Sequence, residues 1–516
     1  MSESFKDTLN RFSDLNLLNY TKHSERGIEK ESLRVLDSTI SSSDHPKKLG
    51  AALTNPFITT DFSESLLEVI TQKKGKIEES LKDLEEVLAF SHRNIPDVIW
   101  PGSIPCSIEN ESEIRIAKYG SSNSAKLKEL YRKGLSLRYG SMMQCVSGIH
   151  YNFSLSNEFF AVWENKGNHS KVFQDEKYLS LVRNFRRNAW LLLYLFGASP
   201  IVPNNFIGNR KNFLKPFNKE DSYLEYATSL RMSELGYMSE AQDDLHITYN
   251  TLDEYIDNLK LALTKKFLPY ETIGIKKGDD YLQINDCIIQ IENEYYSSIR
   301  PKRVVGSGER PINVLRDKGI EYVEVRCMDN NPFFHSSIDE DTAYFLETFL
   351  MVSLIEENKP CDKNEIVEIL DNWQSVVKDG RNPNQQLKVE NTDISLTEAA
   401  ENIIEKMKSY ADALLPEAAE LKTKILKSIK IQEAKLKDSS KTPSGRIIKE
   451  MSENNWNWEE FNNYYFEKNK KFFNESNFNL NKYEKAVEKS LSDLSNLELK
   501  KEVSFDSFLD NYLKSI

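Results

Sequence analysis

Two glutamates in the stretch RGIEKESLR, Glu29 and Glu31, stand two positions apart. Glutamate is a poor strand former, and neighbouring carboxylates repel each other. By itself the stretch is typical of a solvated turn. If it forms a strand, the period of two places both carboxylates on one face and Ile28 on the other, and the paired carboxylates could bind a cation.

Two further segments alternate between apolar and polar residues: GIHYNFSL at 148–155 and IEYVEVRCMD at 320–329. His150 falls on the polar face of the first, and Glu324 and Arg326 share a face of the second. An antiparallel sheet with one face in water gives such alternation without any chemistry, and a single histidine is usually structural. Taken together, however, these polar faces favour a sheet that forms the floor of a polar cavity.

The segment ITTDFSESLLEVI at 58–70 predicts a short strand followed by a helix. Asp61 would be the N-cap residue, and Glu64 three positions later completes a capping-box pattern. Glu68 would then lie two helical turns beyond Asp61 on the same face. Because an unpaired buried charge is costly, a carboxylate among apolar residues at position 68 needs a partner.

Six candidate metal ligands have no obvious partner in the sequence. They are Glu29, Glu31, Asp61, Glu68, His150 and Glu324. A donor set dominated by oxygen suits Mg²⁺ or Mn²⁺ better than structural zinc, and five acids could bind more than one cation. Because Mg²⁺ often shares its coordination between carboxylates and phosphate oxygens, the set predicts a polyphosphate substrate.

The composition of the 516 residues is that of a globular protein. It contains 39% hydrophobic residues, with 68 basic and 80 acidic residues and a net charge of −12, which argues against a nucleic-acid partner. No signal peptide is visible, and the longest apolar run, at 189–202, is shorter than the roughly 20 residues of a membrane span. Five scattered cysteines without a CxxC pair favour a reducing, cytoplasmic location.

The elements that must position these residues are concentrated in the first two-thirds of the chain. Residues 1–25 are predicted to be helical and amphipathic, and strands then alternate with helices up to about residue 335. We predict a single domain over 1–516, with a sheet-containing catalytic part over 20–335 and a mainly helical part over 340–516.

Long blocks of the first two-thirds also carry a family resemblance. They include RGIEKESLRV, LGAALTNPFITTDFSESLLEVIT, WPGSIPC, YGSSNSAKLKELYRKGLSLRYGSMMQCVSGIHYNFSL, YATSLRMSELGY and GIEYVEVRCMDNNPF. Together they resemble the glutamate–cysteine ligases (γ-glutamylcysteine synthetases) of the γ-proteobacterial type. This resemblance implies an α+β fold like that of glutamine synthetase. In that fold a curved, mostly antiparallel sheet forms a funnel, helices pack behind it, and the C-terminal third is helical.

The activity implied by the resemblance is the first step of glutathione biosynthesis. ATP would phosphorylate the γ-carboxylate of L-glutamate, and the amine of L-cysteine would displace phosphate from the γ-glutamyl phosphate. The products would be γ-glutamylcysteine, ADP and phosphate. The resemblance also makes glutathione a feedback inhibitor, and we expect a cytoplasmic monomer that binds neither nucleic acid nor membrane.

The resemblance further implies roles for individual residues. The six candidate ligands would bind two or three Mg²⁺ ions, with Mn²⁺ possible, and Arg132 and Arg326 would stabilise the phosphoryl group in the transition state. Arg231 would pair with the α-carboxylate of the glutamate. The residues around cysteine would be Phe62, Tyr131, Leu135, Gln144, Tyr237 and Tyr296.

Two alternatives remain open at the level of sequence. One is a ligase of the same superfamily that uses another amine, such as 2-aminobutyrate or glycine. The other is a non-catalytic protein that binds Mg²⁺ and a nucleotide on the same sheet. Loss of Arg326 or of two acids would have favoured the second alternative, but all of these residues are present.

Overall fold

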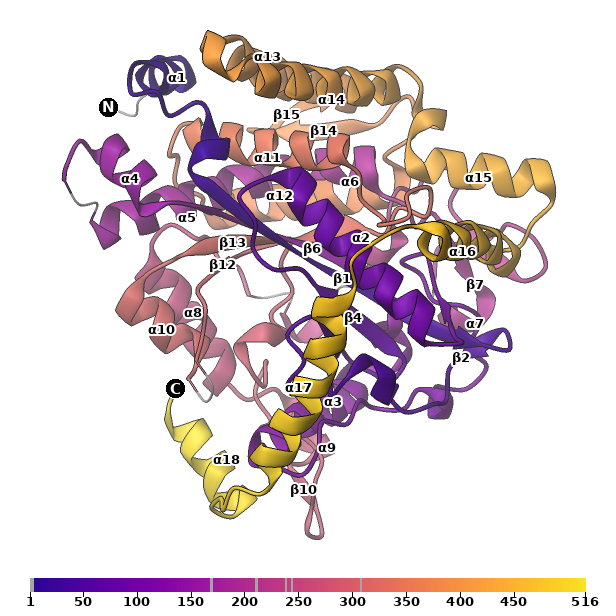
Figure 1. The fold of residues 1–516 in the computed structure, drawn as a ribbon. Coiled ribbons are helices and arrows are strands. Elements are labelled where there is room, and N and C mark those ends of the chain that lie inside the picture. The colour runs from indigo at the N-terminus through magenta and orange to yellow at the C-terminus, as the bar shows by residue number, and fades with distance from the viewer. Residues whose placement is uncertain (1–3, 168–169, 209–211, 237–238, 243–244, 307–308) are drawn as a thin grey trace.

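An antiparallel sheet forms the centre of the computed structural model, which describes residues 4–516 except 168–169, 209–211, 237–238, 243–244 and 307–308 (Figure 1). Its strands follow the order β12-β13-β6-β1-β4-β3, and two short strands, β2 and β5, pair with the end of β1. Their bounds are β1 Ser24–Leu36, β2 Thr39–Ile40, β3 Ile58–Thr60, β4 Leu66–Ile70, β5 Val98–Ile99, β6 Gly148–Leu155, β12 Ile299–Lys302 and β13 Tyr322–Asp329. The expected antiparallel sheet is therefore confirmed.

Alternation of apolar and polar residues divides this sheet into a buried face and a polar face. Ile28, Tyr151 and Val325 are almost fully buried on the face that packs against helices. On the opposite face, β1 sets Glu29 directly beside His150 of β6 and Glu31 directly beside Glu68 of β4. The register of β1 with its two neighbours therefore brings candidate residues from three strands together.

The prediction of a helix after Asp61 is wrong. Residues 58–70 form a β-hairpin, in which β3 and β4 pair and Glu68 lies opposite Thr59. The capping-box pattern was misleading, because Leu67 and Val69 alternate with Glu68 and bury themselves against the core, as a strand requires. The carboxylate of Glu64 nevertheless has a structural role, since it accepts backbone N–H groups from two loops.

The N-terminal helix is shorter than the helical segment predicted over residues 1–25. Helix α1 spans Phe5–Asp14, and the chain then turns through Asn16, which has a positive φ of 56°. Leu17 and Leu18 are buried outside any helix, so their apolar character reflects core packing rather than helical periodicity. Strand β1 begins soon afterwards, at Ser24.

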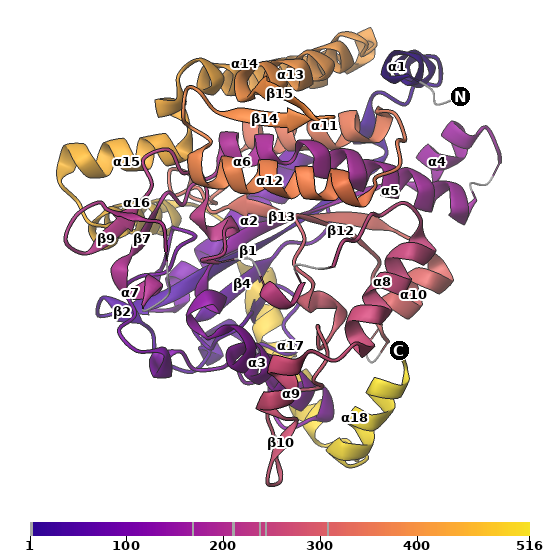
Figure 2. The ribbon, with the colours of Figure 1, turned by 180° about the vertical axis from the view of Figure 1, so that it is seen from behind.

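Helices cover the apolar face of the sheet in two layers (Figures 1 and 2). Helices α5, α6 and α11 lie next to the sheet, and α13 and α14 form the outer layer, as both views show. The helices of the first two-thirds are α1, α2 Ile77–Asn94, α3 Asn123–Tyr139, α4 Asn157–Glu164, α5 Lys171–Asn188, α6 Trp190–Phe196, α7 Asn204–Ile207, α8 Leu252–Thr264, α9 Leu268–Ile273 and α10 Pro311–Lys318.

The last third of the chain is mainly helical, as expected. Its helices are α11 Glu340–Ile355, α12 Lys363–Asp379, α13 Leu396–Asp412, α14 Ala419–Lys437, α15 Pro443–Asn454, α16 Trp458–Glu475, α17 Asn481–Glu498 and α18 Phe505–Lys514. The remaining strands are short: β7 Ile201–Pro203, β8 Lys215–Pro216, β9 Asp221–Tyr223, β10 Lys276–Lys277, β11 Asp280–Tyr281, β14 Gln386–Val389 and β15 Thr392–Ser395. None of the helices in the described part of the chain is long and apolar enough to cross a lipid bilayer.

A buried ion pair ties the sheet to the helix layer behind it. Arg26 of β1 binds both carboxylate oxygens of Glu347 in α11, at 2.8 and 3.0 Å, and both side chains are fully buried. The hydroxyl of Tyr151 donates to the same carboxylate at 2.6 Å. Because all three groups are buried, removal of one leaves the others without their partner.

We predict that Glu347→Gln destabilises the protein by about 3–5 kcal/mol, because Arg26 becomes a buried charge without a counterion. Urea denaturation followed by circular dichroism measures the loss. The matched control is Glu25→Gln, which removes the exposed ion pair to Lys73 and should cost less than about 1 kcal/mol. Equal effects of the two substitutions would contradict the structural importance of the buried pair.

Candidate active site

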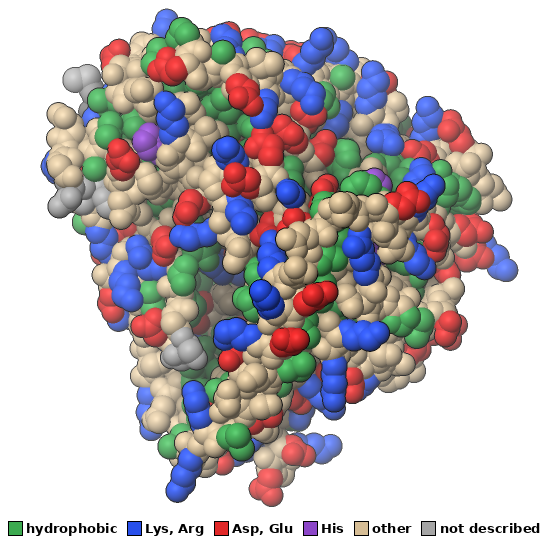
Figure 3. Space-filling view, viewed as in Figure 1, with side chains coloured by type: hydrophobic (Ala, Val, Ile, Leu, Met, Phe, Trp, Pro, Cys, Tyr) green, Lys and Arg blue, Asp and Glu red, His purple; other side chains and the backbone are tan. Residues whose placement is uncertain are grey.

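A polar cavity of about 360 Å³ lies on the polar face of the sheet, between the strands and α3. Figure 3 shows the molecular surface hollowed beside α17. All but one of the site residues predicted from the sequence line the cavity: Glu29, Glu31, Asp61, Phe62, Glu68, Tyr131, Arg132, Leu135, Gln144, His150, Arg231, Tyr296, Glu324 and Arg326. Tyr237, the remaining candidate, lies outside the described residues.

Three candidate ligands approach one another at the middle of the sheet. Donor atoms of Glu29, His150 and Glu324 all lie within 4.8 Å of one another. His150 Nδ1 is 3.1 Å from Glu29 Oε2 and 4.0 Å from Glu324 Oε1, while its Nε2 is 3.6 Å from Glu31 Oε1. The three strands β1, β6 and β13 thus supply one compact group of possible metal ligands.

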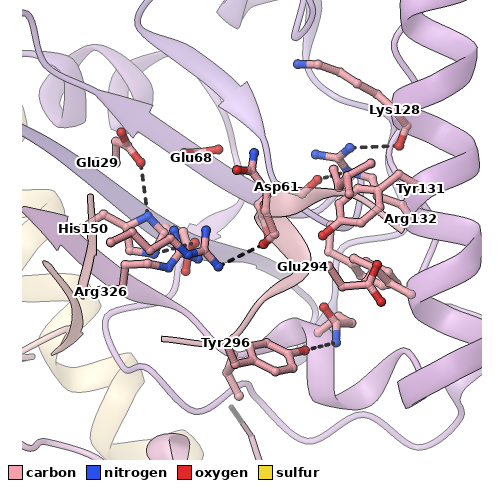
Figure 4. Close-up of a pocket in the computed structure, with 18 of the residues that line it drawn as sticks. Glu29, Asp61, Glu68, Lys128, Tyr131, Arg132, His150, Glu294, Tyr296 and Arg326 are labelled. Carbon is pink, nitrogen blue, oxygen red and sulfur yellow. Dashed lines mark hydrogen bonds and ion pairs between the residues drawn. The ribbon is translucent and has the colours of Figure 1, made fainter. Parts of the chain in front are cut away.

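The remaining acids extend this group toward the β3–β4 hairpin. Glu31 and Glu68 are cross-strand neighbours, and Asp61 lies in the turn between β3 and β4. Figure 4 shows Asp61 between His150 and Arg326 on one side and α3 on the other. We call the six residues the acidic cluster: Glu29, Glu31, Asp61, Glu68, His150 and Glu324.

Burial and the crowding of like charges both raise the pKa values of two carboxyl groups in the acidic cluster. Burial, reinforced by Glu29, Asp61 and Glu31, holds the pKa of Glu68 well above its ordinary value. Burial also raises the pKa of Glu31. Ionisation of every carboxyl group in the cluster would leave several buried negative charges uncompensated when no cation is bound. The cluster without a cation therefore favours partial protonation.

Glu324 has the opposite electrostatic environment. Burial disfavours its charge, yet the neighbouring basic side chains, first Lys302 and Arg326, hold its pKa well below the ordinary value. Arg326 Nη1 lies 3.2 Å from Glu324 Oε1, and Lys302 Nζ lies 3.6 Å from Oε2. Glu324 is thus an ionised carboxylate at neutral pH.

The acidic cluster fits a hard divalent cation. Its donors are carboxylate oxygens and one imidazole, which is the chemistry that Mg²⁺ and Mn²⁺ bind. Glu324 Oε2 is buried and accepts no hydrogen bond from the described residues, so one acceptor is left for another ligand. The excess of negative charge at the cluster would likewise be offset by a bound cation.

Arg326 follows Glu324 by two positions in β13, so the alternation of the strand places both side chains on the cavity face. The backbone N–H of Arg326 donates to Ser298 O at 2.9 Å, on the side of β13 that faces β12. On the other side, the pairing of β13 with β6 shifts register between Val325 and Met328.

Helix α3 provides the wall opposite the sheet. Lys128, Tyr131, Arg132 and Leu135 follow a spacing of three, one and three residues, which places them on one helical face toward the cavity. Arg132 packs over the ring of Tyr119 with 4.7 Å between guanidinium and ring centre, and it donates to the backbone carbonyl of Asp61. α3 is therefore bound directly to the β3–β4 hairpin that carries Asp61.

Sequence reasoning missed several residues of the cavity. Lys128 could have been recognised, because it lies one turn before Arg132 on the same helical face; burial lowers its pKa to about 8. Arg300 and Lys302 stand in the basic stretch IRPKR, whose strand β12 pairs with β13. Tyr512 also lines the cavity, although it lies in the last helix of the chain.

Apolar and polar side chains lie side by side in one part of the cavity lining. Phe62 and Leu135 are buried in the same apolar cluster. Gln144 Nε2 donates to the hydroxyl of Tyr296 at 3.3 Å, so these two polar groups also lie together (Figure 4). The arrangement combines an apolar surface with polar groups beside it.

Arg231 lines the cavity but already has strong partners. Its Nε lies 2.7 Å from Asp329 Oδ1, and its Nη2 donates to Met328 O at 2.9 Å. The guanidinium also packs so closely against Gly148 that an added Cβ there would lie 2.8 Å from Arg231 Nη1. Its position next to β6 and β13 is therefore fixed, and its role toward a substrate stays a prediction.

Comparisons with known proteins agree on one family. The family model described as glutamate–cysteine ligase matches residues 9–376. A glutamate–cysteine ligase of Pseudomonas entomophila is 41% identical, with 100% of this chain and 99% of the relative covered. One of Pseudomonas putida is 42% identical, with 95% and 94% covered.

Solved structures give the same result. The crystal structure of a glutamate–cysteine ligase of Francisella tularensis in complex with AMP has a TM-score of 0.89 and 36% identity, and covers 96% of this chain and 98% of its own. A bifunctional glutathione synthetase of Pasteurella multocida, at 24% identity, shares the fold with a TM-score of 0.72 over 92% of this chain and 56% of its own. This chain belongs to the glutamate–cysteine ligase family.

Proposed function

We propose that the chain carries out the reaction of its family in the cavity between the sheet and α3. Glutamate–cysteine ligases use ATP to join the γ-carboxylate of L-glutamate to the amine of L-cysteine, and so begin glutathione biosynthesis. The observation that carries this placement is the convergence of the acidic cluster, Arg132 and Arg326 on one cavity. The AMP bound by the Francisella tularensis relative supports the use of a nucleotide by this chain as well.

The acidic cluster would hold the divalent cations of the reaction. We assign two or three Mg²⁺ ions to it, with Mn²⁺ as the alternative, because its six donors exceed what a single Mg²⁺ needs once phosphate oxygens share the coordination. When bound, the cations would neutralise the phosphates of ATP and the carboxylate that accepts the phosphoryl group.

Arg326 and Arg132 would stabilise the transferring phosphoryl group from two sides. A planar guanidinium matches the oxygens of a phosphoryl group, and negative charge develops on these oxygens during transfer. Arg326 is held by Glu324 and Arg132 by the β3–β4 hairpin. Their orientation is thus set before ATP binds, which lowers the cost of reorganisation in the transition state.

The two amino acids would bind beside the cluster. Phe62 and Leu135 offer an apolar surface to the cysteine thiol, while the Gln144–Tyr296 pair and Tyr131 offer hydrogen-bonding groups to its polar end. For the glutamate we propose that Arg231 contributes to recognition of its α-carboxylate. Holding the amine against the γ-glutamyl phosphate converts the second step into a unimolecular reaction.

A second cavity of about 430 Å³ is the proposed adenosine subsite. It shares Asn293, Arg300 and Lys302 with the main cavity, and Tyr322 and Leu315 contribute apolar surface. Because Lys302 approaches Glu324, a nucleotide with its phosphates at the acidic cluster could extend its base along β12 into this space.

Further proposals concern regulation and cellular context. Glutathione contains γ-glutamylcysteine, so it would fit the two amino-acid subsites and inhibit by competition. We also propose a cytoplasmic monomer whose partners do not include nucleic acid or membrane. The five cysteines are all free and buried, which supports a reducing compartment.

We predict that the purified protein releases phosphate when Mg²⁺, ATP, L-glutamate and L-cysteine are all present. Omission of either amino acid should lower the rate at least about tenfold, because the ligase transfers the phosphoryl group productively only in the complete complex. A coupled phosphate assay measures the rate. Equal release without cysteine would identify an ATPase instead, and faster turnover with 2-aminobutyrate or glycine would identify another acceptor.

We predict that Glu324→Gln weakens Mn²⁺ binding at least about tenfold, because it removes a ligand charge while it preserves the size of the side chain. Electron paramagnetic resonance of free Mn²⁺ measures binding, and circular dichroism checks the fold. The control is Glu321→Gln, since Glu321 faces Arg303 outside the acidic cluster. An unfolded Glu324→Gln protein would instead make Glu324 a structural partner of Arg326.

We predict that Arg326→Lys lowers kcat at least about a hundredfold, because an ammonium cannot reproduce the planar contacts to the phosphoryl group. Initial rates at saturating substrates measure kcat, and the KM values should change much less. The control is Arg316→Lys on the exposed side of α10. If kcat is retained, Arg326 serves only as the counterion of Glu324.

A further inference from the structure

The last helix of the chain reaches the active-site cavity. Helix α18 ends near the C-terminus, next to α10 and below the hollow seen in Figure 3 (Figure 1). Tyr512 of α18 lines the same cavity as the acidic cluster. The sequence predicted no site residue in this helix, since all of its candidates lie before residue 335.

Apolar packing joins α18 to helix α3. Leu509 is 2% exposed and forms a small core with Leu130 of α3 and Ile284. Tyr131 packs against this core from the cavity side. Tyr131 also lines the proposed cysteine subsite. The packing of α18 against α3 therefore extends to the wall that would receive the acceptor amino acid.

Tyr512 is held in place by a buried ion pair. Arg310 binds Glu292, with 3.1 Å between Nε and Oε1, and donates to the backbone carbonyl of Tyr512 at 3.0 Å. The guanidinium also lies 4.3 Å from the centre of the Tyr512 ring. Asn313 of α10 donates to Ser515 O at 2.7 Å, which fixes the end of α18.

The segment that leads into α18 caps the start of α3. The Glu502 carboxylate accepts the backbone N–H of Asn123 at 2.7 Å, and Glu498 accepts that of Ser121 at 2.8 Å. Carboxylates at a helix N-terminus accept hydrogen bonds from free N–H groups and interact favourably with the positive end of the helix dipole. The C-terminal segment therefore holds α3 both at its first turn and along its side.

We propose that α18 belongs to the acceptor-binding wall, in which Leu509 positions Tyr131 and Tyr512 contacts the substrate, so that the last helix sets the affinity for the acceptor amino acid. The inference rests on the proposed function, because it takes the cysteine subsite to lie at Tyr131. It adds a specificity-determining element from the end of the chain, remote in sequence from all other site residues.

The test compares two leucine substitutions in the full-length protein. Leu509→Asp places a charge in the core between α18 and α3, and should raise KM for cysteine about tenfold while KM for ATP changes less than about twofold. Leu499→Asp, at a side chain that is 84% exposed, is the matched control and should leave both constants unchanged. Unchanged KM for cysteine in Leu509→Asp would overturn the proposal.

A second pair of variants avoids the risk that Leu509→Asp unfolds. Tyr512→Ala should raise KM for cysteine about fivefold or more with an unchanged melting temperature, and Tyr512→Phe, which keeps the ring, should restore most of the affinity. Wild-type values for both variants would overturn the proposal, as would equal increases in KM for ATP and cysteine. Failure of the proposed function itself is distinguishable, because the wild-type protein would then show no cysteine dependence.

Discussion

The central constraint on this structure is the repulsion among carboxylates on one face of the sheet, which the rest of the fold must offset. Glu29, Glu31 and Glu68 are forced together by strand register, and their mutual repulsion opposes folding. The opposite face of the same strands offsets this cost, since it buries residues such as Ile28 and Val325 against the helix layer. The Arg26–Glu347 pair fixes β1 to that layer, and the pairing of β1 with β4 holds Glu31 beside Glu68.

The same constraint explains the arrangement of positive charge around the cavity. Lys302 and Arg326 approach Glu324 from two strands, and Arg132 reaches the β3–β4 hairpin from α3. Each cation is attached to a different element, so the balance of charge also links those elements. The side chains proposed to recognise phosphates therefore also join the sheet to α3.

The alternation of apolar and polar residues predicted the strands that carry His150 and Glu324, but neither the β3–β4 hairpin nor the position of Tyr512. The strands that carry His150 and Glu324 were evident, because alternation of residues is a local signal. Glu68 lines the cavity with the other candidates but lies on a strand and not on the predicted helix, since a capping-box pattern competed with the strand pattern and tertiary packing decided between them. The position of Tyr512 in the cavity depends on contacts between distant parts of the chain, which no local pattern reports. The expected roles of individual residues came from the family resemblance, and they remain predictions.

The place of α18 has a consequence for the synthesis of the protein. Domains generally fold from the N-terminus as the chain emerges from the ribosome. Here β1, the first strand, already carries two acids of the cluster, whereas Tyr512 lies in α18, which is synthesised after the other elements that line the cavity. Until α18 has emerged from the ribosome, the folded part of the chain would contain the acidic cluster without Tyr512 on the cavity wall.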